Sequence, residues 1–519
     1  MSKKNWLQFF KKYHKYPSLV LSLFILLFAV SGIVLNHRQL FSSLDVNRSV
    51  LPEDYHYTHW NKAAVKGSVQ LAGDTAVIYG NIGAWKTHDN YQTFQDFNQG
   101  LPEGMDNRKV ERMLKTSRGE LYAGTLFGLY RLKSNQESWQ KVSLPVKEER
   151  IVDLLEVKDS LYVMTRSHIL VGDCAGRNFK VIVLPAPDDY DGKMSLFLTL
   201  WQIHSGEVFG TLGQLFVDFL GLVFIALALS GLVYFFFPGW IRRRKRKQKP
   251  VIRKARFLKF NLKWHNRLGA WLLGFLIVLT FTGMFLRPPL LIAIANSRVD
   301  KLPYTHLDNP NPWFDQLRRL LYDEELDRFL IATAGKVYYS DDHFTGTIRS
   351  YSHQPPISVM GVNVFEKLKS GDYLVGSFSG IFRWIPEKTF VMDYITRRPH
   401  VPLKTMGPPI SAHPIAGYLK DANGQEILFD YNLGAGNLTS GNGFTPMPRQ
   451  IAQSSFSLWN LALEIHTARF YRIFFGKYYI LFIPLAGLTI LFILITGYMA
   501  YRLGHRKKRK GRRVRPAKS

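Results

Sequence analysis

The chain has 519 residues, a net charge of +29 and a single cysteine, Cys174. One cysteine excludes disulfides within the chain and any redox centre that several cysteines attach or ligate. The hydrophobic fraction of 46% is unexceptional, so a membrane protein would need its apolar residues gathered into long runs.

The positive charge is concentrated in three short segments that contain no Asp or Glu. Residues 1–18 carry five Lys/Arg, residues 241–259 carry eleven and residues 502–519 carry ten. Each segment lies beside a long apolar run, and short basic flanks mark the cytoplasmic side of a membrane. This placement favours contact with anionic lipid and argues against a nucleic-acid partner.

Four apolar runs have the length needed to cross a bilayer as helices, about 20 residues each. They lie at about 17–35, 213–237, 268–286 and 478–500. The first run lacks the small-x-small cleavage pattern of a signal peptide, so we interpret it as a retained helix. With every basic flank inside, the sequence predicts a multi-pass protein of the bacterial inner membrane with both termini in the cytoplasm.

These runs predict nine segments in chain order. The segments are a basic N-terminus (1–16), a first membrane helix (17–37), an outer β domain (38–194), a second membrane helix with an outer extension (195–240), a basic cytoplasmic loop (241–262), a third membrane helix (263–287), a second outer β domain (288–456), a fourth membrane helix with an outer extension (457–501) and a basic cytoplasmic tail (502–519).

The two halves of the chain repeat each other. The stretch "GTLGQLFVDFLGLVFIALALSG" (210–231) aligns without gaps with "GKYYILFIPLAGLTILFILITG" (476–497), and three glycines coincide. An Ile-His dipeptide stands upstream of each, ending at His204 and His466. The repeat predicts two halves of the same orientation, each made of a helix, an outer domain and a helix.

The outer segments contain shorter repeats. Each repeat has the same predicted order of elements: a strand, a turn of small residues, a second strand, a polar turn and a third strand. Their starts lie at residues 74, 119 and 159 in the first half and at 327 and 371 in the second, with a weaker copy at 416–433. This period is near the 40–45 residues typical of a propeller blade. The predicted fold class is therefore membrane α + β: four membrane helices from an internal duplication and a propeller-like cap with three blade-like units per half. Two independent small β domains remain the alternative.

Each half also begins with a histidine that precedes a glycine by 18 residues. The pairs are His14 with Gly32 and His265 with Gly283. Eighteen residues are five helical turns, so the two members share one face about 27 Å apart. An imidazole and a missing side chain on one stripe suit a flat macrocycle packed between helices, and haem is the natural candidate.

The duplication predicts how the histidines pair. We expect His14 and His265 to hold an inner haem and His204 and His466 to hold an outer one, giving two b-type haems with Gly32 and Gly283 packed against them. The alternative is that each histidine is an interfacial polar residue. His37 has no counterpart in the second half and is an alternative outer ligand.

Three further polar residues accompany the helices. Arg38 and Arg287 end the first and third runs, where they either contact haem propionates or mark the level of the lipid headgroups. Asp218 lies inside the second run, and a carboxylate there is costly in lipid, so we expect it to face the bundle interior. Its role is left open.

The helices carry a family resemblance. "WHNRLGAWLLGFLIVLTFTGMFL" (264–286) and "IHTARFYRIFFGKYYILFIPLAGLTILFILITGYMAY" (465–501) resemble the PepSY-associated transmembrane helix family. Members of that family include inner-membrane reductases that carry haem b and pass electrons outward to ferric siderophores. The resemblance implies a haem-dependent oxidoreductase of the ferric-chelate reductase type, although no clear PepSY domain is present.

The donor and acceptor follow from what the chain contains. No nucleotide-binding fingerprint follows a predicted strand, so the donor is expected to be separate, either a cytoplasmic reductase or quinol. The expected acceptor is a ferric chelate or another oxidised compound outside. A different class stays open: a haem-free, membrane-anchored ligand-binding or sensory protein whose propeller-like cap binds the ligand.

Overall fold

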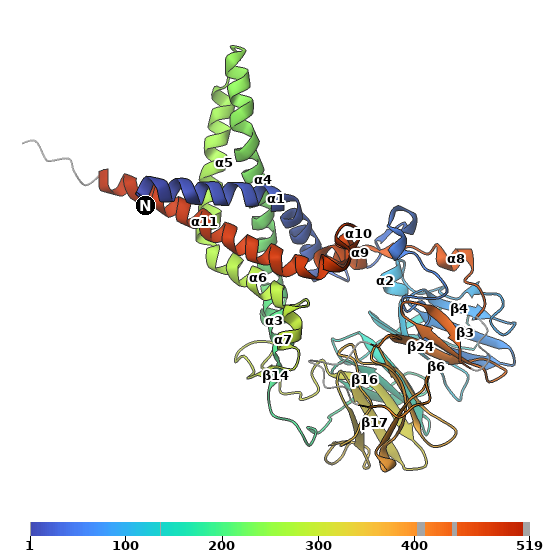
Figure 1. The fold of residues 1–519 in the computed structure, drawn as a ribbon. Coiled ribbons are helices and arrows are strands. Elements are labelled where there is room, and N and C mark those ends of the chain that lie inside the picture. Colours follow the sequence, from blue (N-terminus) through green and yellow to red (C-terminus); the bar gives the residue numbers. More distant parts are fainter. Residues whose placement is uncertain (1, 135, 402–410, 439–443, 512–519) are drawn as a thin grey trace, which may run out of the picture. The chain divides into compact units, whose positions relative to one another are not determined.

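The computed structural model divides the chain into two compact units, each built from both halves of the sequence (Figure 1). It describes residues 2–134, 136–401, 411–438 and 444–511. The part of the predicted cytoplasmic tail at 512–519 lies outside these residues. We call 1–38, 193–308 and 459–519 the helical unit, and 39–192 and 309–458 the sheet unit.

Three helical segments of the helical unit are long and apolar enough to cross a membrane, within the described residues. They are Lys3–Asn36, Glu207–Arg246 and Arg469–Gly504. Their main helices are α1 (Lys3–Asn36), α4 (Gly210–Arg246) and α11 (Phe482–Gly511).

The third predicted run is divided between two helices. They are α5 (Ile252–Trp271) and α6 (Leu273–Phe285), bent by 66°, and they add a fourth candidate span only if the pair crosses as one. Gly274 lies just past the break, and glycine is a poor helix former. The predicted loop at 241–262 is largely helical, because α4 extends to Arg246 and α5 begins at Ile252.

The long helices enclose a small apolar core. α1 contacts α4 and α11, α4 runs beside α5, and α11 also contacts α6 (Figure 1). Leu220 and Val223 of α4 and Leu276 of α6 are buried there with Ile490 and Leu494 of α11. Many outward apolar side chains of these helices are exposed, as expected for surfaces that face lipid. The shorter helices are α2 (Met105–Arg108), α3 (Leu196–Ser205), α7 (Leu290–Ile294), α8 (Arg449–Ala452), α9 (Leu458–His466) and α10 (Arg472–Phe475).

In its described residues, the sheet unit contains six antiparallel sheets of three or four strands, and the strands of each sheet follow one another in chain order. The first is β2 (Gly67–Ala72), β3 (Thr75–Gly80), β4 (Gly83–Thr87) and β5 (Gln95–Asp96); the second is β6 (Val110–Lys115), β7 (Leu121–Thr125), β8 (Gly128–Leu132) and β9 (Gln140–Val142); the third is β10 (Ile151–Val157), β11 (Ser160–Thr165), β12 (Ile169–Asp173) and β13 (Lys180–Ile182). The fourth is β16 (Leu317–Asp323), β17 (Arg328–Thr333), β18 (Val337–Ser340) and β19 (Arg349–Ser350); the fifth is β20 (Val362–Lys367), β21 (Tyr373–Ser377), β22 (Gly380–Ile385) and β23 (Phe390–Asp393); the sixth is β24 (Ile415–Lys420), β25 (Glu426–Asp430) and β26 (Gly434–Asn437).

The six sheets form a closed ring. Their first strands, β2, β6, β10, β16, β20 and β24, contact one another in this order, and β24 also contacts β2. Apolar cores fill the spaces between neighbouring sheets, for example Tyr79, Met113 and Trp139 between the first two. Short pairs tie distant segments together: β1 (Asp45–Val46) with β27 (Phe456–Ser457) in the sheet unit, and β14 (Met194–Ser195) with β15 (Arg298–Val299) in the helical unit.

The sequence repeats match the sheets with one consistent difference. The predicted units at 74, 119, 159, 327 and 371 begin at the second strand of each sheet and miss its first strand. These first strands carry charged residues, as in "VERMLK" and "LRRLLYD", which hide the apolar alternation expected of a strand. The weak sixth unit begins instead at the first strand, β24.

A buried ion pair at the ring centre gives a stability prediction. Lys66 Nζ lies 2.5 Å from Glu111 Oε2, and both side chains are about 15% exposed. Replacing Glu111 with Gln leaves the ammonium buried without its partner, so we expect the sheet unit to lose about 3–5 kcal/mol of unfolding free energy. Glu149→Gln is the matched control, because its pair with Lys141 is 42–45% exposed and such pairs contribute about 0–1 kcal/mol. Equal losses in the two variants, measured by chemical denaturation, would contradict the prediction.

The same pair predicts an acid dependence. Burial opposes ionisation, but Lys66 and Arg150 lower the pKa of the Glu111 carboxyl from 4.5 to about 2. A pKa that is lower in the folded state gives stability that is complete above pH 4.5 and is lost as the pH falls toward 2. The unfolding temperature of the wild type should therefore drop through this window more than that of Glu111→Gln.

Candidate functional site

Two pairs of histidine rings lie close together in the helical unit, with the ring planes of each pair steeply inclined to one another. The ring centres of His14, in α1, and His265, in α5, are 6.0 Å apart. The ring centres of His204, at the end of α3, and His466, at the end of α9, are also 6.0 Å apart. The structure thus brings together the same histidines that the duplication pairs in the sequence. Their role as ligands stays a prediction.

Each imidazole is held by its Nδ1 atom against another helix. For three of the rings the partner of Nδ1 is a backbone carbonyl: that of Ile493 for His14 (2.9 Å), of Leu279 for His204 (2.9 Å) and of Phe28 for His466 (3.0 Å). Nδ1 of His265 lies 2.8 Å from the Ser230 hydroxyl, and His265 also contacts the Leu227 carbonyl. A carbonyl oxygen only accepts, so Nδ1 carries the proton and Nε2 keeps its lone pair. In the described chain, Nε2 of these four rings has no protein hydrogen bond.

The four acceptor sites are copies of one local motif. In each, a carbonyl oxygen stands four residues before a glycine, and Ser or Thr comes directly before that glycine. The four stretches are "FAVSG" (28–32), "LALSG" (227–231), "LTFTG" (279–283) and "ILITG" (493–497). The sequence analysis used two of these glycines and missed the other two, Gly231 and Gly497. Their alignment in the duplicated helices was the signal that could have identified them.

The glycines make room for the imidazoles. A Cβ atom placed on Gly283 would lie 2.6 Å from His204 Cε1, and one on Gly497 would lie 2.8 Å from His14 Cε1. At Gly32 the nearest atom is His466 Cε1, at 3.2 Å. The sequence analysis expected a macrocycle against Gly32 and Gly283, whereas a histidine ring fills the space that a side chain would take there.

The sequence analysis placed each histidine and its glycine on a single helix, and this is confirmed for α1 only. His14 and Gly32 both lie on α1, so this helix contributes to both histidine pairs. His265 lies on α5 and Gly283 on α6, and the 66° bend between these helices makes the prediction of a single straight stripe wrong.

His37 contacts Asp218 rather than another histidine. Its Nε2 lies 2.6 Å from Asp218 Oδ2, and the Asn36 amide donates to Asp218 Oδ1 at 3.0 Å. Asp218 therefore faces the bundle interior, as expected, and its partners compensate for the burial of the carboxylate. The alternative in which His37 replaces an outer histidine is not supported by this arrangement.

This contact predicts energetic coupling between the two side chains. We expect Asp218→Asn and His37→Gln each to lower the unfolding temperature, and the double variant to lose less than the sum of the single losses. Contacting residues of this kind couple by about 0.5–3 kcal/mol. A double-mutant cycle by thermal unfolding in detergent measures it, and strict additivity would show that the contact contributes nothing.

Arginines gather near the ends of the outer helices. The Arg38 guanidinium stacks 3.7 Å from the centre of the Trp459 ring. Arg469 forms an ion pair with Glu464, and Arg287 lies near both. Two guanidiniums and one carboxylate thus lie near one another, with an excess of positive charge among the three. Arg469 is a candidate that the sequence analysis missed.

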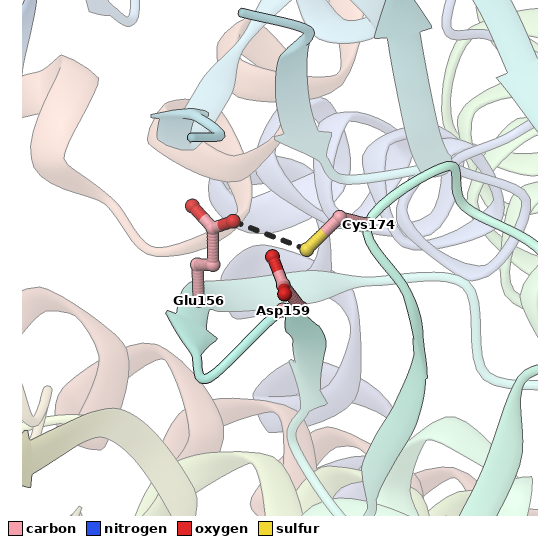
Figure 2. Close-up of side chains that lie close together, drawn as sticks. All are labelled: Glu156, Asp159 and Cys174. Atoms are coloured by element: carbon pink, nitrogen blue, oxygen red, sulfur yellow. Dashed lines mark hydrogen bonds between the residues drawn. The ribbon is translucent and has the colours of Figure 1, made fainter. Parts of the chain in front are cut away.

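A second cluster lies in the sheet unit, where Glu156, Asp159 and Cys174 place their ligand-type atoms within 4.8 Å of one another (Figure 2). The Cys174 thiol donates to Glu156 Oε1 at 3.1 Å, and Ser117 donates to the same carboxylate through its N–H and its hydroxyl. Burial and the adjacent carboxylate raise the pKa of Cys174 to about 12, so the thiol stays protonated. These contacts join the second and third sheets and give the cluster a structural explanation.

The fold and the duplicated histidine sites define a membrane protein built from two equivalent halves. The sequence profile of the PepSY-associated TM region matches residues 1–238 and again 237–503, and the chain belongs to this family. No curated protein matches the chain.

Solved structures with some likeness to the chain have low TM-scores. The extracellular domain of the hybrid two-component system BT4673 from B. thetaiotaomicron has 12% identity and a TM-score of 0.36, with 72% of this chain and 32% of that chain covered. The extracellular domain of BT3049 from the same organism has 14% identity and a TM-score of 0.33, covering 75% and 44%. YCF48 from Cyanidioschyzon merolae has 8% identity and a TM-score of 0.30, covering 76% and 87%. This chain spans about a third of the length of the BT4673 domain, and at such scores the likeness establishes no shared role.

Proposed function

We propose that the chain holds two b-type haems and carries electrons across the bacterial inner membrane to an oxidised acceptor outside. His14 and His265 would hold the inner haem, and His204 and His466 the outer one. The observation that carries the proposal is the 6.0 Å separation of the ring centres in both pairs. Two imidazoles that ligate one metal ion, each nitrogen about 2 Å from it, have ring centres about 6 Å apart.

The surroundings of the rings fit this role. A ligating histidine almost always donates its other ring N–H to a carbonyl, carboxylate or water, which fixes its tautomer and orientation. All four Nδ1 atoms are engaged with a neighbouring helix, which leaves Nε2 for a metal. A bound haem would supply a one-electron redox centre, while the chain supplies ligands, spacing and an apolar sheath.

Charge near the outer pair supports the same assignment. Haem carries two carboxylates, and guanidiniums are well suited to bind them through paired hydrogen bonds. Arg287 and Arg469 lie near the single carboxylate of Glu464, so this group can accept a further negative charge. The Arg38 guanidinium stacks on the Trp459 ring, so it is less available to bind a haem carboxylate.

The spacing of the two pairs suits transfer across a membrane. On α1, 18 residues separate His14 from Gly32, the glycine that lies against His466. This corresponds to about 27 Å along the helix, close to the thickness of the hydrocarbon layer. With the basic segments in the cytoplasm, His14 and His265 would lie at the inner edge and His204 and His466 at the outer edge.

The proposal includes the cap and the partners. We take the ring of six sheets as a six-bladed propeller outside the membrane. The donor would be a cytoplasmic reductase or quinol, and the acceptor a ferric chelate, which makes the chain a haem-dependent oxidoreductase. Lipid is the other partner, and nucleic acid is not one.

An optical spectrum of the purified full-length protein tests the proposal. We expect a Soret band that shifts on reduction with dithionite, and a pyridine haemochrome assay that finds about two haems per chain. A colourless preparation that is folded by circular dichroism would contradict the proposal and favour the haem-free ligand-binding or sensory protein.

A further inference from the structure

A group of charged side chains meets at the centre of the ring of six sheets. It contains five cations and three carboxylates, which we call the cationic centre: Lys66, Arg150, Arg166, Arg318, Arg319, Glu111, Glu148 and Asp315. Arg150 joins its two parts, because it lies near Glu111 on one side and near Arg318 on the other. These eight side chains together carry an excess of two positive charges.

Two of these residues, Glu111 and Arg318, stand at a backbone irregularity that recurs around the ring. Five of the six first strands have a β-bulge at their second residue, which is left out of the pairing with the next strand. These bulged residues are Glu111, Val152, Arg318, Asn363 and Ala416. Lys66 directly precedes the first strand of the remaining sheet, β2. Bulges redirect side chains and are over-represented next to functional sites.

Two of the guanidiniums have no carboxylate within ion-pair distance in the described chain. Arg319 is 6% exposed, and its N–H groups reach only carbonyl oxygens, including that of Val152; its Nε has no partner. Arg318 donates to the carbonyls of Asp315 and Leu317, both at 2.9 Å. Burial and the adjacent Arg166 lower the pKa of Arg318 to about 9. Buried cations of this kind are costly unless an anion accompanies them.

Two of the guanidiniums are partly accessible to solvent. The side chain of Arg150 is 38% exposed and that of Arg166 is 22% exposed, while Arg319 is buried. Gly361, with φ +94°, permits the close passage of Arg318, because a Cβ atom there would lie 2.6 Å from Arg318 Cγ. The arrangement keeps the guanidiniums together although they repel one another.

We propose that the cationic centre binds a compact anion with at least two negative charges, carried on carboxylates or phosphates. Guanidiniums recognise both groups through paired N–H donors. The site lies within the sheet unit and does not require that haem be bound. Pyrophosphate and citrate, both free of iron, are the probes that distinguish a phosphate ligand from a carboxylate ligand.

Isothermal titration of the full-length protein in detergent tests the proposal. We expect saturable binding of at least one probe, and at least a tenfold weakening in Arg318→Gln and in Arg150→Gln, about 1.4 kcal/mol. Arg349→Gln is the matched control, because Arg349 is an exposed residue of β19, at the far edge of the same sheet as Arg318. No binding of either probe, or equal binding by all three variants, would overturn the proposal.

A second measurement does not depend on the folding of variants. Phenylglyoxal modifies accessible guanidiniums, and peptide mapping by mass spectrometry locates the modified arginines. We expect the binding probe to protect Arg150 and Arg318 of the wild type while leaving Arg349 reactive. Modification of Arg150 at an unchanged rate in the presence of saturating probe would overturn the proposal, whatever the haem content of the sample.

Discussion

Replacing His466 with alanine should reduce the haem content of the purified protein by about half. The remaining imidazole, His204, would then lack its partner across the 6.0 Å gap, whereas the His14 and His265 pair would be untouched. The pyridine haemochrome assay should fall from about two haems per chain to about one, and the electron paramagnetic resonance signal of one bis-histidine centre should disappear.

His37→Ala is the matched control for this variant. His37 lies at the outer end of α1, and its Nε2 is engaged with Asp218, so its removal should leave both haems in place. Loss of haem in His37→Ala but not in His466→Ala would reverse the assignment of the outer site. Full haem content in both variants would mean that the outer histidine pair holds none.

Alanine at Gly283 or Gly497 should disturb the histidine that lies against it, while alanine at Gly231 should not. The new Cβ would lie 2.6 Å from His204 Cε1 in the first variant and 2.8 Å from His14 Cε1 in the second, closer than atoms pack. At Gly231 the nearest histidine atom is at 3.7 Å, an ordinary contact. Overpacking of this kind costs about 1–3 kcal/mol.

Two measurements separate these variants. Gly283→Ala and Gly497→Ala should unfold at lower temperature and show a displaced reduction potential for one haem, since moving the ring breaks its Nδ1 hydrogen bond. Gly231→Ala should keep both values, or gain stability because alanine favours helix by about 1 kcal/mol. If all three variants behave alike, the glycines serve general helix packing rather than the placement of the imidazoles.

Much of the helical unit could be predicted because its chemistry repeats in the sequence. The duplication alone paired His14 with His265 and His204 with His466, and the structure brings these rings together. The hydrogen-bond acceptors could not be predicted, since they are backbone carbonyls on other helices and their positions depend on packing. The bend between α5 and α6 also escaped prediction, because an apolar run has the same composition whether it is straight or broken.

In the sheet unit, some strands could be predicted from the sequence and others could not. The second, third and fourth strands of most sheets alternate visibly, so the repeats and their period could be found. The first strands could not, because bulged charged residues such as Glu111 and Arg318 interrupt their pattern. Both of these bulged residues belong to the cationic centre.

The division of both histidine pairs and of the ring of sheets between the two halves has a consequence for how such a chain arose. Each histidine pair takes one ring from either half, and the ring of sheets closes only where β10 meets β16 and β24 meets β2. A half-length precursor would have had open strand faces and single imidazoles, so it would have been complete only as a two-fold symmetric dimer. In a single chain the two halves are free to differ, as the contact between His37 and Asp218, which lies in the first half alone, illustrates.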